Sequence, residues 1–122
     1  MHHEMRRVLV VDDERPIRSA ASHILHRAGY KVDVAVDGLD ALQRLRGSTA
    51  DAVLLDMKMP VRDGLAFLEA IRADPFLGQV AVVIMSADDK LERLGLALGG
   101  TSFIRKPFAV ADLVRALKQV LG

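Results

Sequence analysis

Three acidic residues directly follow two strongly apolar runs of the sequence. Asp12 and Asp13 come after the run 8–11, and Asp56 comes after the run 52–55. Each acid alone is compatible with an ordinary turn or helix-capping role. If they converge, two carboxylates about 4 Å apart repel by about 4 kcal/mol at an effective dielectric of 20. Such a cluster must hold a cation, hold a proton or serve a function. Oxygen ligands with no histidine or cysteine nearby favour a hard divalent ion, Mg²⁺ by preference.

Two further polar residues follow apolar runs and could bind an anion close to those acids. Ser86 comes after the run 80–85, and Lys106 comes shortly after 101–104, just before Pro107. A residue before proline is held extended, and a cis bond at that position would turn the lysine inward. A serine hydroxyl that donates to a phosphoryl oxygen makes a bond worth about 1.5–3 kcal/mol. The ordinary alternatives are a solvated lysine and a turn serine.

The segments that must position these residues alternate between strand and helix patterns. Between residues 17 and 28, for example, apolar residues recur at helical spacing, with Pro16 near the start and Gly29 at the end. We predict strands at 8–11, 31–36, 52–55, 80–85 and 101–104, and helices at 17–28, 39–47, 63–74, 90–98 and 110–121.

This alternation predicts an α/β fold with a parallel sheet and helices on both faces. The first, third and fourth runs are apolar throughout, as central strands must be, whereas the second and fifth are mixed and suit the edges. With right-handed crossovers, the strand order is 2-1-3-4-5, a flavodoxin-like doubly wound (βα)5 arrangement. The order reverses between the first and third strands. Ligands bind at the carboxyl ends of strands at such a point, where Asp12, Asp13 and Asp56 lie.

Composition limits the remaining choices. The 122 residues predict one domain over 1–122, with residues 1–5 as a flexible tip. The absence of cysteine excludes disulfides and thiol chemistry. No apolar run is long enough to span or insert into a membrane, and the first residues lack a signal peptide's apolar region, so a cytoplasmic location is expected. A net charge of +1 gives no basis for direct nucleic-acid binding.

Together, the segments VLVVDDE (8–14), LLDMKMP (54–60) with Asp63-Gly64, Ser86-Ala87 and FIRKPF (103–108) resemble the receiver domain of bacterial two-component response regulators. The resemblance covers residues 6–121, and the order and spacing of the motifs are more specific than any one of them. It implies that Asp56 accepts a phosphoryl group from a histidine kinase, a phosphotransfer protein or a small acyl phosphate. Asp13, Asp56 and the backbone carbonyl of Lys58 would then bind Mg²⁺, with Asp12 contributing through water.

The resemblance also implies a phosphate cradle and a switch. The Lys106 ammonium, the Ser86 hydroxyl, which stands where threonine is commoner, and the backbone N–H groups of Met57 and Ala87 would bind phosphoryl oxygens. Phe103 would change rotamer with Ser86, although it could be a plain core or edge-strand aromatic. Lys58 and Asp88 occupy positions that tune dephosphorylation, and we hypothesise that they pair across the site mouth. Two solvated charges are an equal alternative.

The expected output surface comprises the helix 90–98, the strand 101–104 and the helix 110–121, where Gly95, Gly99 and Gly100 weaken the local structure. Basic residues that would line it, or be ordinary solvated charges, are Arg93, Arg105, Arg115 and Lys118. The sequence ends after the last helix, so we expect a stand-alone receiver or the receiver portion of a longer chain.

Two other functions fit parts of the pattern. A phosphohydrolase of haloacid dehalogenase type also forms an aspartyl phosphate, but it needs an acid where Lys58 stands and space for a cap. A flavodoxin-like electron carrier would place its FMN phosphate beside Asp12-Asp13-Glu14, which would repel it. We therefore expect a switch that assists its own phosphorylation and dephosphorylation and is not a multiple-turnover enzyme.

Overall fold

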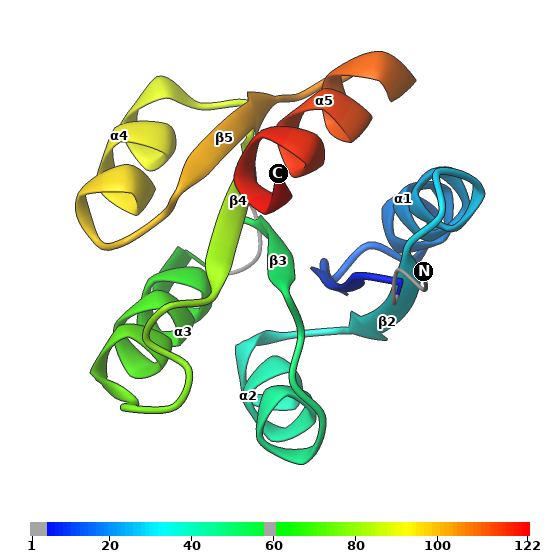
Figure 1. The fold of residues 1–122 in the computed structure, drawn as a ribbon. Helices are drawn as coiled ribbons and strands as arrows, with labels where there is room; N and C mark the ends of the chain where they lie inside the picture. The colour runs from blue at the N-terminus through cyan, green and yellow to red at the C-terminus, as the bar shows by residue number, and fades with distance from the viewer. Residues whose placement is uncertain (1–4, 58–60) are drawn as a thin grey trace.

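A single parallel sheet flanked by helices forms the molecule (Figure 1). The structure is a computed structural model that describes residues 5–57 and 61–122. Within those residues the elements are β1 (Arg7–Val11), α1 (Arg15–Arg27), β2 (Lys31–Ala35), α2 (Gly38–Gly47), β3 (Ala52–Asp56), α3 (Val61–Ala73), β4 (Ala81–Ser86), α4 (Asp89–Ala97), β5 (Ser102–Arg105) and α5 (Val110–Leu121).

The strand order is β2-β1-β3-β4-β5, with every neighbouring pair parallel, which confirms the predicted topology. Burial explains the order. All five residues of β3 are buried, whereas exposed positions recur along β2 and β5. An apolar strand such as β3 is stable only when helices cover both of its faces, and the mixed strands can occupy the edges.

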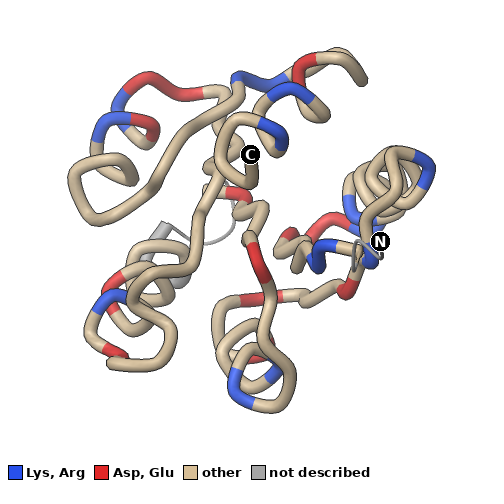
Figure 2. Tube along the Cα trace, viewed as in Figure 1, with Lys and Arg blue, Asp and Glu red and all other residues tan. Residues whose placement is uncertain are grey.

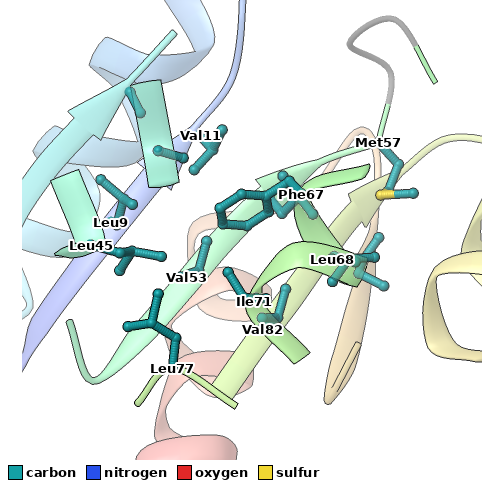
Figure 3. Packing of buried hydrophobic residues seen from close by; sticks show 14 residues of the cluster. Leu9, Val11, Leu45, Val53, Met57, Phe67, Leu68, Ile71, Leu77 and Val82 are labelled. Carbon is teal, nitrogen blue, oxygen red and sulfur yellow. The ribbon is translucent and has the colours of Figure 1, made fainter. Parts of the chain in front are cut away.

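Two apolar clusters, one on each face of the sheet, hold the helices in place. Phe67, Leu68 and Ile71 of α3 are fully or almost fully buried and pack with Val53 of β3 and Val82 of β4 (Figure 3). On the other face, α1 and α5 contribute a second cluster that consists of Ala21, Leu25, Leu113, Ala116 and Leu117. Figure 1 shows the same division, with α1 and α5 on one side and α2, α3 and α4 on the other. The sheet that carries the acids is therefore anchored from both sides.

Most predicted boundaries lie within one or two residues of the observed ones. The structure extends β3 to Asp56 and β4 to Ser86, so the polar residues predicted to follow these strands are their last residues. Helix α3 begins at Val61, two residues before the predicted start. The predicted flexible tip 1–5 lies outside the described residues except for Met5, which is exposed.

The glycines near α4 permit close packing. A Cβ atom on Gly95 would lie 2.5 Å from Cδ1 of Ile84, and one on Gly100 would lie 2.2 Å from the same atom. Gly99 has a φ of 118°, a conformation that favours glycine. Close packing explains why a residue of low helix propensity occupies position 95, because α4 and the following turn lie directly on β4.

Arg72, at the end of α3, ties this turn to the preceding loop. Its Nε and Nη2 donate to the Gly99 carbonyl at 2.9 and 2.5 Å, and its Nη1 donates to the carbonyls of Gly78 at 2.9 Å and Val80 at 2.7 Å. Burial lowers the pKa of this guanidinium from its ordinary value. One side chain therefore joins the α3–β4 loop to the α4–β5 turn.

Both signs of charge occur on helices on either side of the sheet (Figure 2). This distribution agrees with the near-neutral total charge of +1. Among the described helices, none has the length and apolar character needed to cross a membrane.

Candidate functional site

The three predicted acids converge at the carboxyl ends of β1 and β3, which are neighbours in the sheet. Asp12, Asp13 and Asp56 each offer a carboxylate oxygen, and these oxygens all lie within 4.8 Å of one another. Asp12 and Asp56 are fully buried, whereas Asp13 is exposed. The convergence of the acids predicted from the strand order is therefore present.

Backbone hydrogen bonds explain how Asp12 is held. Its N–H donates to the Ala35 carbonyl at 3.2 Å, which continues the β1–β2 pairing past the end of β1. Its Oδ1 accepts from the Glu14 N–H at 2.8 Å, the local bond by which an aspartate fixes a turn. The β1–α1 turn thus directs this carboxylate toward Asp56.

Lys106 lies against both buried acids. Its Nζ is 3.0 Å from Oδ1 of Asp56 and 3.5 Å from Oδ2 of Asp12, and the lysine side chain is only 11% exposed. Its N–H donates to the Ser86 carbonyl at 2.9 Å, so the backbone is fixed beside the end of β4. The Lys106–Pro107 peptide bond is cis. The solvated-lysine alternative is therefore wrong for this residue.

Among the described residues the charges at this site do not balance, because the Lys106 ammonium contacts the carboxylates of Asp12 and Asp56 and a third carboxylate, that of Asp13, lies close to both. The pKa of Asp12 is raised from 3.8 to about 6, mainly by burial and also by the neighbouring Asp56, against the lowering effects of the Glu14 N–H and Lys106. Oδ2 of Asp12 is buried without a hydrogen bond among the described residues. A divalent cation would supply the missing positive charge, and an all-oxygen ligand set fits a hard ion.

Ser86 lies at the end of β4, next to Met85, which is paired with Asp56. The serine is 3% exposed, and its hydroxyl donates to the Asp88 carbonyl at 2.9 Å while accepting from the Asp88 N–H at 3.0 Å. Asp88 in turn caps α4, because its Oδ1 accepts from the Lys90 N–H at 2.7 Å. The hydroxyl is thus linked directly to the start of α4.

The other residues of the predicted cradle have different surroundings. The Met57 N–H donates to the Met85 carbonyl at 3.0 Å and its side chain is buried, so its role toward a phosphoryl oxygen stays a prediction. Ala87 is exposed. Together with Lys106 it lines a hollow beside the start of α1. Lys58 lies outside the described residues, which leaves both its carbonyl and its pairing with Asp88 as predictions.

Phe103 lies on the edge strand β5 and is 40% exposed, so it is not a core aromatic, and its switch role stays a prediction beside the edge-strand alternative. It pairs with Ile84 in the sheet and lines a hollow of about 520 Å³ between β5 and α5, together with Arg115 and Gln119. Arg105 makes ion pairs with Asp89 and Glu92 of α4, the latter at 3.0 Å. Arg115 is 3.5 Å from Asp112.

Sequence reasoning missed one residue that contacts the site. Nη1 of Arg18, one turn into α1, donates to the backbone carbonyl of Asp12 at 2.8 Å. Arg15 and Arg18 lie near each other in the sequence, and spacing alone gives no reason to prefer one of them. Only the path of the turn shows which guanidinium reaches the backbone carbonyl of Asp12.

Comparison with known proteins agrees with this geometry. Residues 8–118 match the family described as "Response regulator receiver domain". Over 119 residues the chain is 37% identical to Transcriptional regulatory protein PrrA of Mycobacterium leprae, covering 94% of this chain and 49% of the relative. Over 117 residues it is 35% identical to Response regulator MprA of Mycobacterium sp. (strain KMS), covering 94% of this chain and 50% of the relative.

The chain thus spans about half the length of these curated relatives. The solved structure of chemotaxis response regulator CheY4 of Vibrio cholerae is similar over its whole length, with a TM-score of 0.90, 33% identity and coverage of 97% of this chain. These matches give the phosphohydrolase alternative no support. The chain belongs to the response regulator receiver domain family.

Proposed function

We propose that the Asp56 carboxylate accepts a phosphoryl group with the help of Mg²⁺ and that the domain switches its surface in response. The observation that carries this proposal is the contact of Lys106 Nζ with Oδ1 of Asp56 beside a second buried acid, Asp12. A structural ion pair would need one acid for one lysine. The excess of carboxylates favours a site built for a metal and an incoming phosphate.

The chemistry follows from the positions of these groups. An Asp56 oxygen attacks phosphorus in line with the leaving group, the new O–P bond forms, and the donor's P–N or P–O bond breaks. The electron pair of that bond leaves with the donor imidazole or carboxylate. Asp12, Asp13 and Asp56, together with the Lys58 carbonyl, would hold Mg²⁺, which when bound neutralises charge on the phosphoryl oxygens. Lys106 provides a second positive charge.

The phosphoryl group would draw two side chains toward itself. Lys106 can remain near Asp56 and bind a phosphoryl oxygen, because its Nζ already lies at the carboxylate. Ser86 must exchange its hydrogen bond to the Asp88 carbonyl for one to the phosphoryl group. Since a charged acceptor makes a stronger bond than a neutral one, this exchange is favourable.

A hollow beside the site supports docking of a phosphodonor protein, which we propose to be a histidine kinase or a phosphotransfer protein. It has a volume of about 450 Å³ and is lined by apolar groups of α1, including Pro16 and Ile17, and by Phe108. Lys106 and Ala87 also line it, so a donor seated there would be next to the phosphate cradle.

The output would pass through α4, β5 and α5. Movement of Ser86 pulls on Asp88, which caps α4, and α4 is tied to β5 by Arg105. Leu94, Phe103 and Val110 expose apolar surface on these three elements. We propose that this surface contacts a downstream protein and that the domain itself does not bind nucleic acid.

The test is incubation with acetyl phosphate and Mg²⁺, followed by intact mass spectrometry and a count of phosphate released per chain. We expect one phosphoryl adduct on the wild type and none when EDTA replaces Mg²⁺. No hydrolysis of a phosphate ester is expected. An adduct that forms equally well in EDTA, or sustained turnover of an ester, would contradict the proposal.

A further inference from the structure

Arg18 contacts the acidic site through the main chain. Its Nη1 donates to the Asp12 carbonyl at 2.8 Å, although its side chain belongs to α1 and points back toward the turn that precedes the helix. We propose that Arg18 is a positioning residue for the metal-binding acids, which it orients by fixing the peptide plane between Asp12 and Asp13. This inference rests on the proposed function.

Three hydrogen bonds restrain Asp12, and one of them is the bond from Arg18. Its N–H is bonded to the Ala35 carbonyl, its Oδ1 to the Glu14 N–H, and its carbonyl to Arg18. The first bond fixes the backbone N–H of Asp12 and the second fixes its carboxylate, and neither fixes the direction of its carbonyl. Arg18 supplies that remaining restraint.

The position of Asp13 depends more strongly than that of Asp12 on the hydrogen bond from Arg18 to the Asp12 carbonyl. Its side chain is exposed and makes no hydrogen bond or ion pair within the described part of the chain. The peptide group is planar, so the direction of the Asp12 carbonyl sets the plane that leads to the Asp13 Cα atom. A guanidinium that holds this carbonyl therefore places the Asp13 carboxylate relative to Asp56.

The position of Arg18 is not explained by helix stability. The first turn of α1 contains no acid, and a positive charge near a helix N-terminus opposes the helix dipole. Groups that orient metal ligands typically change metal affinity by 10–100-fold when removed. Arg18 would act in this way, whereas its charge alone would repel a cation and weaken binding.

Orientation of the acids by Arg18 would strengthen Mg²⁺ binding, whereas its positive charge would weaken it. A matched pair of variants separates these two effects. Arg18→Met removes the hydrogen bond and the charge. Arg15→Met removes a charge from the same helix at a residue that makes no hydrogen bond or ion pair in the described part of the chain. Mg²⁺ affinity is measured by isothermal titration calorimetry on chains shown to be folded by circular dichroism.

We expect the Mg²⁺ dissociation constant of Arg18→Met to rise about tenfold, and that of Arg15→Met to equal the wild-type value or fall below it. At saturating Mg²⁺, the rate of phosphorylation of Arg18→Met by acetyl phosphate should return to near the wild-type rate. A purely structural role would lower both the affinity and the saturated rate.

Arg18→Lys is measured in parallel, because it keeps the charge and replaces the planar fork with a shorter ammonium. We expect weaker Mg²⁺ binding there too, by a smaller factor, and this variant decides the question if Arg18→Met does not fold. Wild-type affinity in both Arg18 variants would overturn the inference. Failure of the wild type to bind Mg²⁺ would instead contradict the proposed function.

Discussion

At the scale of single residues, the main feature of the site is that two buried carboxylates share one lysine among the described residues. Asp12 and Asp56 are fully buried, and Lys106 is the lysine that contacts both. Burying a charge is costly unless it is paired, so the metal-free site stores unfavourable electrostatic energy. The raised pKa of Asp12, about 6, is the direct expression of that energy.

This raised pKa predicts how stability depends on pH without metal. Because the folded state holds a proton on Asp12 more tightly than the unfolded state, the free energy of unfolding contributed by this group falls as pH rises from about 4 to about 6. Asp12→Asn should therefore be more stable than the wild type above pH 6, by at most about 3 kcal/mol, and should lose that advantage near pH 4.

Urea denaturation in EDTA across this pH range measures the effect. The exposed acid Asp33 provides the control, since Asp33→Asn should follow the wild-type profile. A constant difference between Asp12→Asn and the wild type at every pH would contradict the assignment. Saturating Mg²⁺ should abolish the advantage of the variant, because the metal then neutralises the carboxylate.

At the scale of elements, much of the arrangement could be predicted from the sequence. The burial of β1, β3 and β4 and the mixed character of β2 and β5 are visible as apolar and alternating runs, so the sheet order and the convergence of the acids followed. Contacts made by long side chains to distant carbonyls were not predictable. Neither Arg18 nor Arg72 carries a local pattern that shows which carbonyl it reaches.

Arg72 leads to a prediction about the switching segment. Its bonds to Gly99, Gly78 and Val80 connect two loops, and each bond from a charged donor is worth about 1.5–3 kcal/mol. Arg72→Met should lower the free energy of unfolding by about 2–3 kcal/mol. Hydrogen exchange should accelerate at the Gly100 and Thr101 amides, which are bonded to Gly95 and Val82.

The exposed Arg93 of α4 is the matched control, and Arg93→Met should change stability by less than about 0.5 kcal/mol. If Arg72→Met destabilises the chain while the exchange of those two amides keeps its wild-type rate, the linkage between the loops is wrong.

At the scale of the whole molecule, the site and the proposed output surface are joined by a short covalent and hydrogen-bonded path. Ser86 ends β4, Asp88 caps α4, and Arg105 ties α4 to β5. A ligand can shift such a path only by binding its two states differently. The Ser86 hydroxyl is the group whose bonding would change.

Removal of that hydroxyl should uncouple the two regions. Ser86→Ala is expected to accept beryllofluoride with Mg²⁺ at Asp56 but to lose the change in hydrogen exchange over α4 and β5 that the wild type shows on binding. The exposed Ser19 supplies the control, because Ser19→Ala should respond like the wild type. An undiminished response in Ser86→Ala would mean that coupling takes another route.

The central claim concerns the carboxylate that receives the phosphoryl group. Treating the acetyl phosphate product with sodium borohydride reduces an aspartyl phosphate to homoserine, which peptide mass mapping locates. We predict homoserine at position 56, at the buried acid that contacts Lys106, and none in Asp56→Asn. Homoserine at position 12 or 13, or an unmodified Asp56 in a chain that carries the adduct, would contradict the account.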